Sequence, residues 1–171
     1  MKKKTAPIVS VVIGSDTDLT IMQEAVDVLD AFGVSNEKYL TSAHRAPDRT
    51  ASFARDAAKR GIKVIIAGAG AAAHLAGVIA SQTLLPVVGV PIEATSLGGL
   101  DALLATVQMP GGVPVATMAI GKAGAKNAAL LAARILALED DALKERLRNY
   151  VENMAREVEK KHDNMKTPQL S

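Results

Sequence analysis

Five short apolar runs, separated by segments with helical spacing, most constrain how this 171-residue chain can fold. Four are rich in β-branched residues, which favour strands, and the second is weaker. The expected strands span residues 8–13, 37–41, 63–67, 86–90 and 115–120. Successive runs start 23 to 29 residues apart, about the length of a strand, a crossover helix and two connections. The spacing therefore predicts a three-layer α/β/α fold around a five-stranded parallel sheet.

Helical patterns fill the gaps between the expected strands and follow the last one. Gly33 and Gly61 suit helix ends, and Pro47 suits a first helical turn. The expected helices span residues 19–32, 47–60, 72–82, 96–107 and 123–138. The last is rich in Ala with few charges, which indicates burial on most sides, either centrally or between subunits.

Residues 140–162 have a different pattern, in which apolar side chains recur at helical spacing among many charges. These are Leu143, Leu147, Tyr150, Val151, Met154 and Val158. The pattern predicts an amphipathic C-terminal helix, which packs either on its own domain or on a neighbouring subunit. We expect residues 1–171 to form a single catalytic domain, with residues 163–171 as a tail.

Composition argues against several classes of protein. The net charge is +2 with basic residues scattered over the expected helices, so no basic stripe marks a nucleic-acid partner. The absence of Cys excludes disulfides and thiolate chemistry. Met1 and three lysines precede the first strand, where a signal segment would be long and uncharged. We expect a soluble cytoplasmic protein without a membrane partner.

A polar loop follows the second expected strand, and another follows the first. Residues 42–48 read Ser-Ala-His-Arg-Ala-Pro-Asp, and residues 14–18 read Gly-Ser-Asp-Thr-Asp. The carboxyl ends of parallel strands form the edge where α/β proteins bind ligands, so both loops should build one site. His44 can give and take a proton near neutral pH, although it can also cap the following helix.

A third loop, residues 68–74, reads Gly-Ala-Gly-Ala-Ala-Ala-His. Its small side chains expose backbone N–H groups at the start of a helix, where an anion or a flat ring can approach closely. It also matches the dinucleotide fingerprint G-x-G-x-x-A, with Glu93 about 20 residues further on. That match follows the third strand rather than the first, and a purely structural glycine turn is a further interpretation.

Five stretches together resemble the PurE family in its class I form, the N5-carboxyaminoimidazole ribonucleotide mutases. They are residues 14–18, 42–48, 65–75, 85–91 and 107–115. The resemblance implies a flavodoxin-like fold, an octamer, and no metal or organic cofactor. It also implies an isomerase of purine biosynthesis that moves a carboxylate from the exocyclic amine of an aminoimidazole ribonucleotide to ring carbon 4.

Roles for individual residues follow from this chemistry and from the resemblance. His44 is the expected acid-base catalyst. Hydroxyl and guanidinium groups suit a phosphate, so Ser15, Ser42 and Arg45 are its expected ligands. The resemblance favours Asp18 as a ribose ligand. The expected pocket also includes Ala43, Gly70, Ala71, His74 and Leu75.

Purely structural roles are alternative interpretations for several of these residues. Arg45 can pair with Asp48, and Asp16 and Asp18 can act as helix N-caps. A structural hydrogen bond is an equal interpretation for His74.

The sequence departs from the family pattern at two positions of the third loop. Ala71 stands where the family usually has Gly, and Ala76 where it usually has Pro. A methyl at Ala71 can crowd a left-handed backbone angle or narrow the pocket, and Ala76 loosens the first helical turn. We expect the activity to survive both changes.

Three other functions compete with the mutase. A class II carboxylase, which takes free carbon dioxide, is disfavoured because its glycine loop differs more. A carboxylase acting on another nucleotide, as in the nickel-pincer cofactor pathway, shares the His-Arg loop but usually carries an extra N-terminal region. A non-catalytic nucleotide-binding module comes last.

Overall fold

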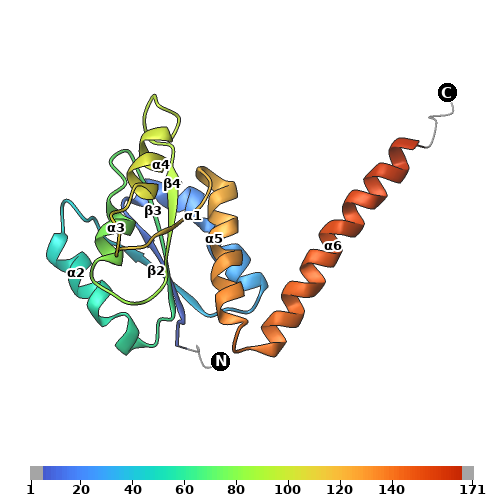
Figure 1. The fold of residues 1–171 in the computed structure, drawn as a ribbon, viewed down its shortest axis with the longest axis horizontal. Coiled ribbons are helices and arrows are strands. Elements are labelled where there is room, and N and C mark those ends of the chain that lie inside the picture. Colours follow the sequence, from blue (N-terminus) through green and yellow to red (C-terminus); the bar gives the residue numbers. More distant parts are fainter. Residues whose placement is uncertain (1–5, 167–171) are drawn as a thin grey trace. The chain divides into compact units, whose positions relative to one another are not determined.

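The fold is described by a computed structural model covering residues 6–166, and its centre is a five-stranded, entirely parallel sheet (Figure 1). The strand order is β2-β1-β3-β4-β5. The strands are β1 (Val9–Ile13), β2 (Asn36–Leu40), β3 (Val64–Gly70), β4 (Val87–Ile92) and β5 (Ala116–Thr117). All five predicted strands are therefore confirmed. The fifth is shorter than expected, with two paired residues.

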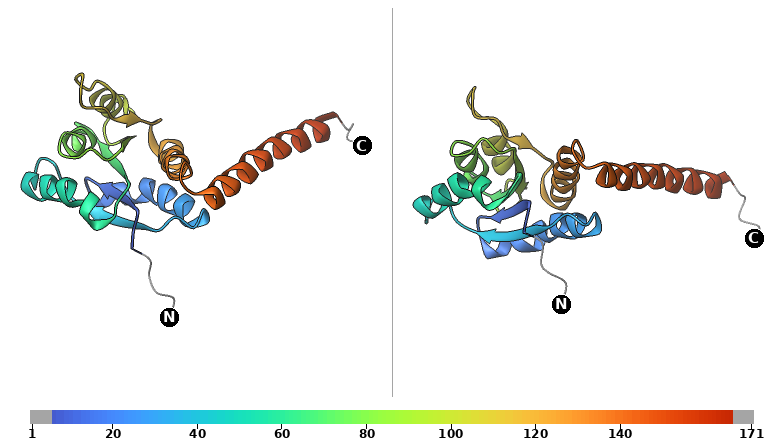
Figure 2. Two further views of the ribbon diagram at one scale, coloured as in Figure 1. Left: turned by 60° about the horizontal axis from the view of Figure 1, so that its bottom comes forward. Right: turned by 90° about the horizontal axis from the view of Figure 1, so that it is seen from below.

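Helices cover both faces of the sheet (Figure 2). In chain order, the α-helices of the described residues are α1 (Leu19–Ala31), α2 (Pro47–Asp56), α3 (Leu75–Ala80), α4 (Leu100–Val107), α5 (Gly121–Leu136) and α6 (Asp141–Lys166), of which α6 is described separately below. Lys122 and Lys126 of α5 both pair with Glu24 of α1, so these two helices lie on one face. The helices α2 and α3 pack against each other on the other face. The predicted three-layer α/β/α architecture is confirmed.

Left-handed glycines determine where two of the helical segments begin or end. The predicted helix 96–107 begins at Leu100, because Gly98 and Gly99 have φ of 61° and 84°. The predicted helix 47–60 is α-helical only to Asp56 and continues as a 3-10 turn, Ala58–Arg60. Its predicted end at Gly61 is confirmed, with φ of 89°. Left-handed residues cannot continue a right-handed helix.

The core is built from the central strands. All five residues of β1 are buried, as are the first five of β3, whereas β2 at the sheet edge is half exposed. Near-continuous apolar strands are what a parallel sheet covered on both faces requires. Glycine allows the helices to approach closely: a Cβ on Gly68 would overlap Met22 of α1.

The chain divides into two compact units, with the boundary between Ala133 and Arg134. The second unit contains the end of α5 and the 26-residue α6. In the first turns of α6 Leu143 and Leu147 are buried, whereas further along Met154 and Val158 are exposed. The predicted amphipathic helix is confirmed, but it continues to Lys166, so residues 163–166 are helical and not a tail. Residues 167–171 lie outside the described part of the chain.

A backbone contact at the start of α5 yields a test of this packing. A Cβ on Gly124 would overlap the carbonyl oxygen of Ala119, which cannot rotate away. Alanine normally favours a helix over glycine by about 1 kcal/mol, but overpacking typically costs about 1–3 kcal/mol.

We expect Gly124→Ala to lower the free energy of unfolding, measured in urea. The control is Gly111→Ala, where a Cβ meets nothing within 4 Å and the change should stay within about 0.5 kcal/mol. A Gly124→Ala protein as stable as the unsubstituted one would contradict this packing.

Candidate active site

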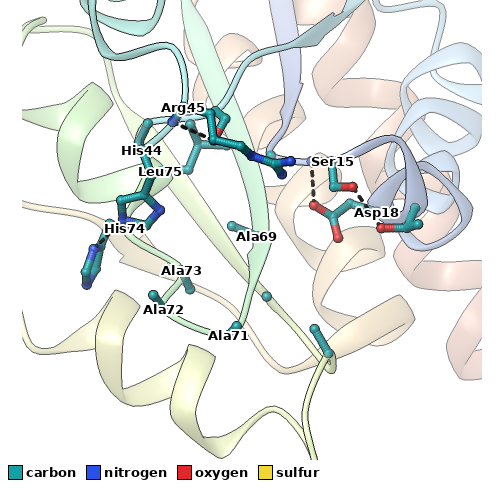
Figure 3. A pocket seen from close by; sticks show the side chains of 16 residues that line it. Ser15, Asp18, His44, Arg45, Ala69, Ala71, Ala72, Ala73, His74 and Leu75 are labelled. Atoms are coloured by element: carbon teal, nitrogen blue, oxygen red, sulfur yellow. Dashed lines mark hydrogen bonds between the residues drawn. The ribbon is translucent and has the colours of Figure 1, made fainter.

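Loops from three adjacent strands enclose a cavity of about 260 Å³ at the carboxyl edge of the sheet (Figure 3). All ten residues predicted for the site line it: Ser15, Asp18, Ser42, Ala43, His44, Arg45, Gly70, Ala71, His74 and Leu75. They come from the ends of β1, β2 and β3, which are neighbours in the sheet although far apart in the sequence. The structure thus brings the predicted residues together.

The parallel pairing of β1 holds the three loops at a common level. At its end, the Gly14 N–H donates to the Gly68 carbonyl at 3.3 Å, and the Thr41 N–H donates to the Ile13 carbonyl at 3.1 Å. These bonds join the start of the first loop to β3 and the start of the second loop to β1. The loops therefore begin side by side and open on the same edge.

The first loop folds back on its own carboxylate. The Ser15 N–H donates to Asp18 Oδ2 at 2.9 Å, and Asp18 is buried. Burial raises the pKa of Asp18 above its ordinary value, although hydrogen bonds from the Ser15 and Gly14 backbone oppose this change. Asp18 makes no side-chain cap bond at the start of α1, but its bond to the Ser15 N–H forms part of a capping box at the 3-10 turn Asp16–Asp18, whose N-cap is Ser15. The capping interpretation of Asp18 is therefore supported in this form.

The second loop presents a cation that has no partner within residues 6–166. The Arg45 N–H donates to Ser42 Oγ at 3.2 Å, which fixes the turn. The Arg45 guanidinium extends toward Ser15 and Asp18 in Figure 3, and no ion pair joins it to Asp48 in the described part of the chain. Two serine hydroxyls beside an uncompensated guanidinium suit an anionic ligand.

The third loop contains two alanines in the left-handed region. Ala71 and Ala73 have φ of 52° and 44°, a conformation that costs non-glycine residues energy. The expected left-handed angle at Ala71 is therefore confirmed. Because these residues interrupt the helical pattern, α3 begins at Leu75 and not at residue 72. A dinucleotide fingerprint opens directly into a helix, so that interpretation does not fit this loop.

Close approach of the backbone explains a glycine in the same loop. A Cβ on Gly70 would lie 2.5 Å from Ala94 Cβ and 2.9 Å from the Ile92 carbonyl oxygen. The end of β3 can therefore lie against the segment after β4 only without a side chain at this position. Methyl groups of the neighbouring alanines form an apolar wall of the cavity.

Two histidines meet at the other end of the cavity from the Arg45 guanidinium. His44 Nε2 lies 2.8 Å from His74 Nδ1, and the rings are edge-on with an interplanar angle of 74°. One ring must donate and the other accept, so the contact links the tautomer of one ring to that of the other. His44 does not cap α2, whose N-cap is Ala46 without a side-chain cap bond. The structural hydrogen bond considered for His74 is present, and its partner is His44.

The cavity is also lined by six residues that the sequence analysis did not single out: Gly14, Thr17, Ala69, Ala72, Ala73 and Ala94. Five lie inside loops already assigned to the site. Ala94 follows β4, and the strand-end rule that located the other loops would also have located it. Within residues 6–166, no three or more His, Asp or Glu side chains gather as possible metal ligands, and no helix is long and apolar enough to cross a membrane.

The fold and the pocket define a flavodoxin-like α/β protein with a small-molecule site at its strand ends. The AIR carboxylase family model matches residues 8–157, and the chain belongs to this family. An N5-carboxyaminoimidazole ribonucleotide mutase of Pyrococcus horikoshii is 55% identical, covering 93% of this chain and 89% of that protein. The mutase of Bacillus subtilis is 52% identical, with 93% and 98% covered. The crystal structure of Treponema denticola PurE matches with a TM-score of 0.85 and 26% identity, covering 94% of this chain and 99% of that one.

The raised pKa of Asp18 predicts how stability depends on pH. A carboxyl group whose pKa is higher in the folded chain favours folding most when protonated, and this contribution is lost as pH rises through the folded pKa. Asp18→Asn cannot ionise but keeps an oxygen for the Ser15 N–H. We expect this variant to be more stable than the original chain at pH 7, with the difference disappearing below the ordinary pKa of 3.8.

Urea denaturation at several pH values measures this difference. The control is Asp16→Asn in the same loop, where the carboxylate is exposed. This change removes only the repulsion between Asp16 and Asp18, the smallest of the effects on the Asp18 pKa, so a smaller gain at neutral pH is expected. A loss of stability in Asp18→Asn at pH 7 would show that the buried charge is well compensated.

Proposed function

We propose that this chain converts N5-carboxyaminoimidazole ribonucleotide to 4-carboxy-5-aminoimidazole ribonucleotide, an isomerisation in de novo purine (IMP) biosynthesis. Relatives named as this mutase, 52% and 55% identical over nearly the whole chain, support the assignment. The observation that carries it is the division of one cavity into an anion-binding end and an end with paired imidazoles.

The ribonucleotide is bound through its charged and polar groups. Its phosphate lies at Ser15, Ser42 and Arg45, where two hydroxyls and a guanidinium offer directed hydrogen bonds. Asp18 accepts hydrogen bonds from the ribose hydroxyls, because its second oxygen, Oδ1, has no hydrogen bond to the described residues. The imidazole ring then extends toward His44, between Ala43, Gly70, Ala71, His74 and Leu75.

His44 moves the proton in both halves of the reaction. It first protonates the exocyclic nitrogen as the N–C bond to the carboxylate breaks, which releases carbon dioxide. Ring carbon 4 then attacks the carbon dioxide and forms the new C–C bond, and His44 takes the proton that this carbon loses. His44 gives one proton in the first step and regains one in the second, so it returns to its starting state without an external acid or base.

The methyl-lined wall retains carbon dioxide between the two steps. Ala69, Ala71 and Ala73 present methyl groups to the cavity and offer no polar side-chain atom. Such a surface does not favour water, which would dilute or hydrate the released gas. The small residues of the third loop therefore have a chemical role beside the structural one.

We further propose that the chain acts as one catalytic domain in a cytoplasmic homo-oligomer, an octamer as the family resemblance implies. Tyr150, Val151, Met154 and Val158 of α6 are 38–66% exposed in the single chain. A row of exposed apolar side chains on one helix is best buried against further copies of the protein.

The His44 assignment predicts a separation of binding from turnover. His44→Asn should reduce kcat by about a hundredfold to ten-thousandfold, the usual cost of losing a general acid-base. Calorimetry should show nucleotide affinity within a few-fold of the original. His162→Asn, an exposed histidine on α6, is the matched control and should be fully active. Retention of more than about a tenth of the turnover by His44→Asn would refute the mechanism.

The exposed face of α6 predicts assembly. Light scattering at micromolar concentration should report a closed oligomer of the mass of eight chains. Met154→Glu combined with Val158→Glu should lower that mass, because it places charge in the apolar contact. A monomer in the unsubstituted protein would overturn the proposal.

A further inference from the structure

A second cavity, of about 320 Å³, adjoins the candidate active site on the side of β2. We call it the annex. It shares Gly14, Ser15, Ser42 and Arg45 with the first cavity, and its remaining wall is formed by Asp16, Leu40, Thr41, Ala46 and Arg49. The shared residues include all three proposed phosphate ligands. A phosphate held by them therefore lies where the two cavities meet, with one side toward the annex.

Arg49 contributes a second guanidinium to the annex. It lies in the first turn of α2, four residues after Arg45. The Arg49 Nε–H donates to Tyr39 Oη at 3.3 Å, and the guanidinium carbon lies 5.2 Å from the centroid of the Tyr39 ring. The Tyr39 ring in turn stacks on buried Phe53, with centroids 4.3 Å apart. Arg49 is thus positioned by an anchored aromatic side chain.

The charge of Arg49 is not neutralised by its contacts. Tyr39 is a neutral partner, and no ion pair to Arg49 occurs in the described part of the chain. Arg60 provides the contrast, because it also lies over an aromatic ring, that of Phe53, but it makes two hydrogen bonds to the Glu37 carboxylate. Arg60 is a satisfied structural arginine, whereas Arg49 keeps a free charge.

The charges around the annex favour an anion. Arg45 and Arg49 both line it, against one carboxylate, Asp16, which accepts hydrogen bonds from Ser15 Oγ and the Thr17 N–H. A phosphate monoester carries about −1.5 to −2 charges at neutral pH. Against the Asp16 carboxylate a single guanidinium leaves no net positive charge in the annex, whereas two guanidiniums leave one.

We propose that Arg49 is a second cationic ligand for the phosphate of the substrate and acts with Arg45 from the annex side. This inference rests on the proposed function, because it takes the ligand to be a phosphate ester held at Ser15, Ser42 and Arg45. Arg49 lines only the annex, whereas His44 and His74 line only the first cavity, so Arg49 contributes to binding and not to the proton transfers.

Kinetics and binding together test Arg49. We expect Arg49→Gln to raise KM about three- to tenfold, because the variant loses an exposed ion pair between the guanidinium and the multiply charged phosphate. The kcat should stay within about twofold of the original. Its affinity for ribose 5-phosphate, measured by calorimetry, should fall by a similar factor. The dependence of KM on salt should also flatten, because one fewer charge faces the ligand. Arg49→Lys keeps the charge and should restore most of the affinity.

Arg55→Gln is the matched control, since it removes the same charge from the same helix. Arg55 bonds to Gln82 and does not line either cavity of the site, so its KM and salt dependence should not change. Tyr39→Phe keeps the ring but removes the hydroxyl that fixes Arg49, and a KM between those of the original and Arg49→Gln is expected. If Arg49→Gln does not fold, Tyr39→Phe tests the role of Arg49 in its place.

The outcomes separate this inference from the proposed function. Unchanged affinity of Arg49→Gln for ribose 5-phosphate, with Arg45→Gln impaired, overturns the role of Arg49 and leaves the mutase intact. A chain that does not turn over the carboxyamino ribonucleotide, but loses ribose 5-phosphate affinity in Arg49→Gln, overturns the mutase and supports the anion site.

Discussion

The position of β1 between β2 and β3 in a parallel sheet is the constraint on which the site depends. Backbone hydrogen bonds between the strands and at their ends, such as Gly14 to Gly68 and Thr41 to Ile13, bring three loops to one edge. Each loop then contributes different groups. The loop after β1 contributes hydroxyls and a carboxylate, the loop after β2 an imidazole and a guanidinium, and the loop after β3 a wall of methyl groups. No single loop contains all the groups that the proposed binding and proton transfer require.

The site is maintained at a cost to stability. Asp18 keeps a carboxylate in a buried place that raises its pKa, and Ala71 and Ala73 hold left-handed backbone angles that glycine would adopt more easily. Strained backbone angles and buried charges of this kind are typical of functional sites, where they are retained despite their cost in stability. Here the strained turn directly precedes His74, which contacts His44, and α3 begins only at Leu75, so the geometry of the histidine pair depends on this turn.

The parallel sheet and the convergence of its two polar loops could be predicted from strand spacing and polar strand ends, whereas the roles expected for Asp18 and His74 came from the family resemblance. The contact between His44 and His74 could not be predicted, since it joins residues 30 positions apart through the conformation of two loops. The late start of α3 could not be predicted because Ala favours helices, and the left-handed backbone at Ala71 and Ala73 overrides that preference. Arg49 was missed because its contact to Tyr39 crosses from the second strand to the helix that follows it.

The central claim is that one cavity both releases carbon dioxide from nitrogen and returns it to ring carbon 4. The direct test uses N5-carboxyaminoimidazole ribonucleotide with ¹³C in its carboxylate, in the presence of excess unlabelled bicarbonate and carbonic anhydrase. Nuclear magnetic resonance of the product then shows where the label is. We expect the ¹³C to be found in the new carboxylate on carbon 4, because the gas does not leave the methyl-lined pocket. Unlabelled product, with the ¹³C in bicarbonate, would contradict the account and indicate a carboxylase that takes carbon dioxide from solution.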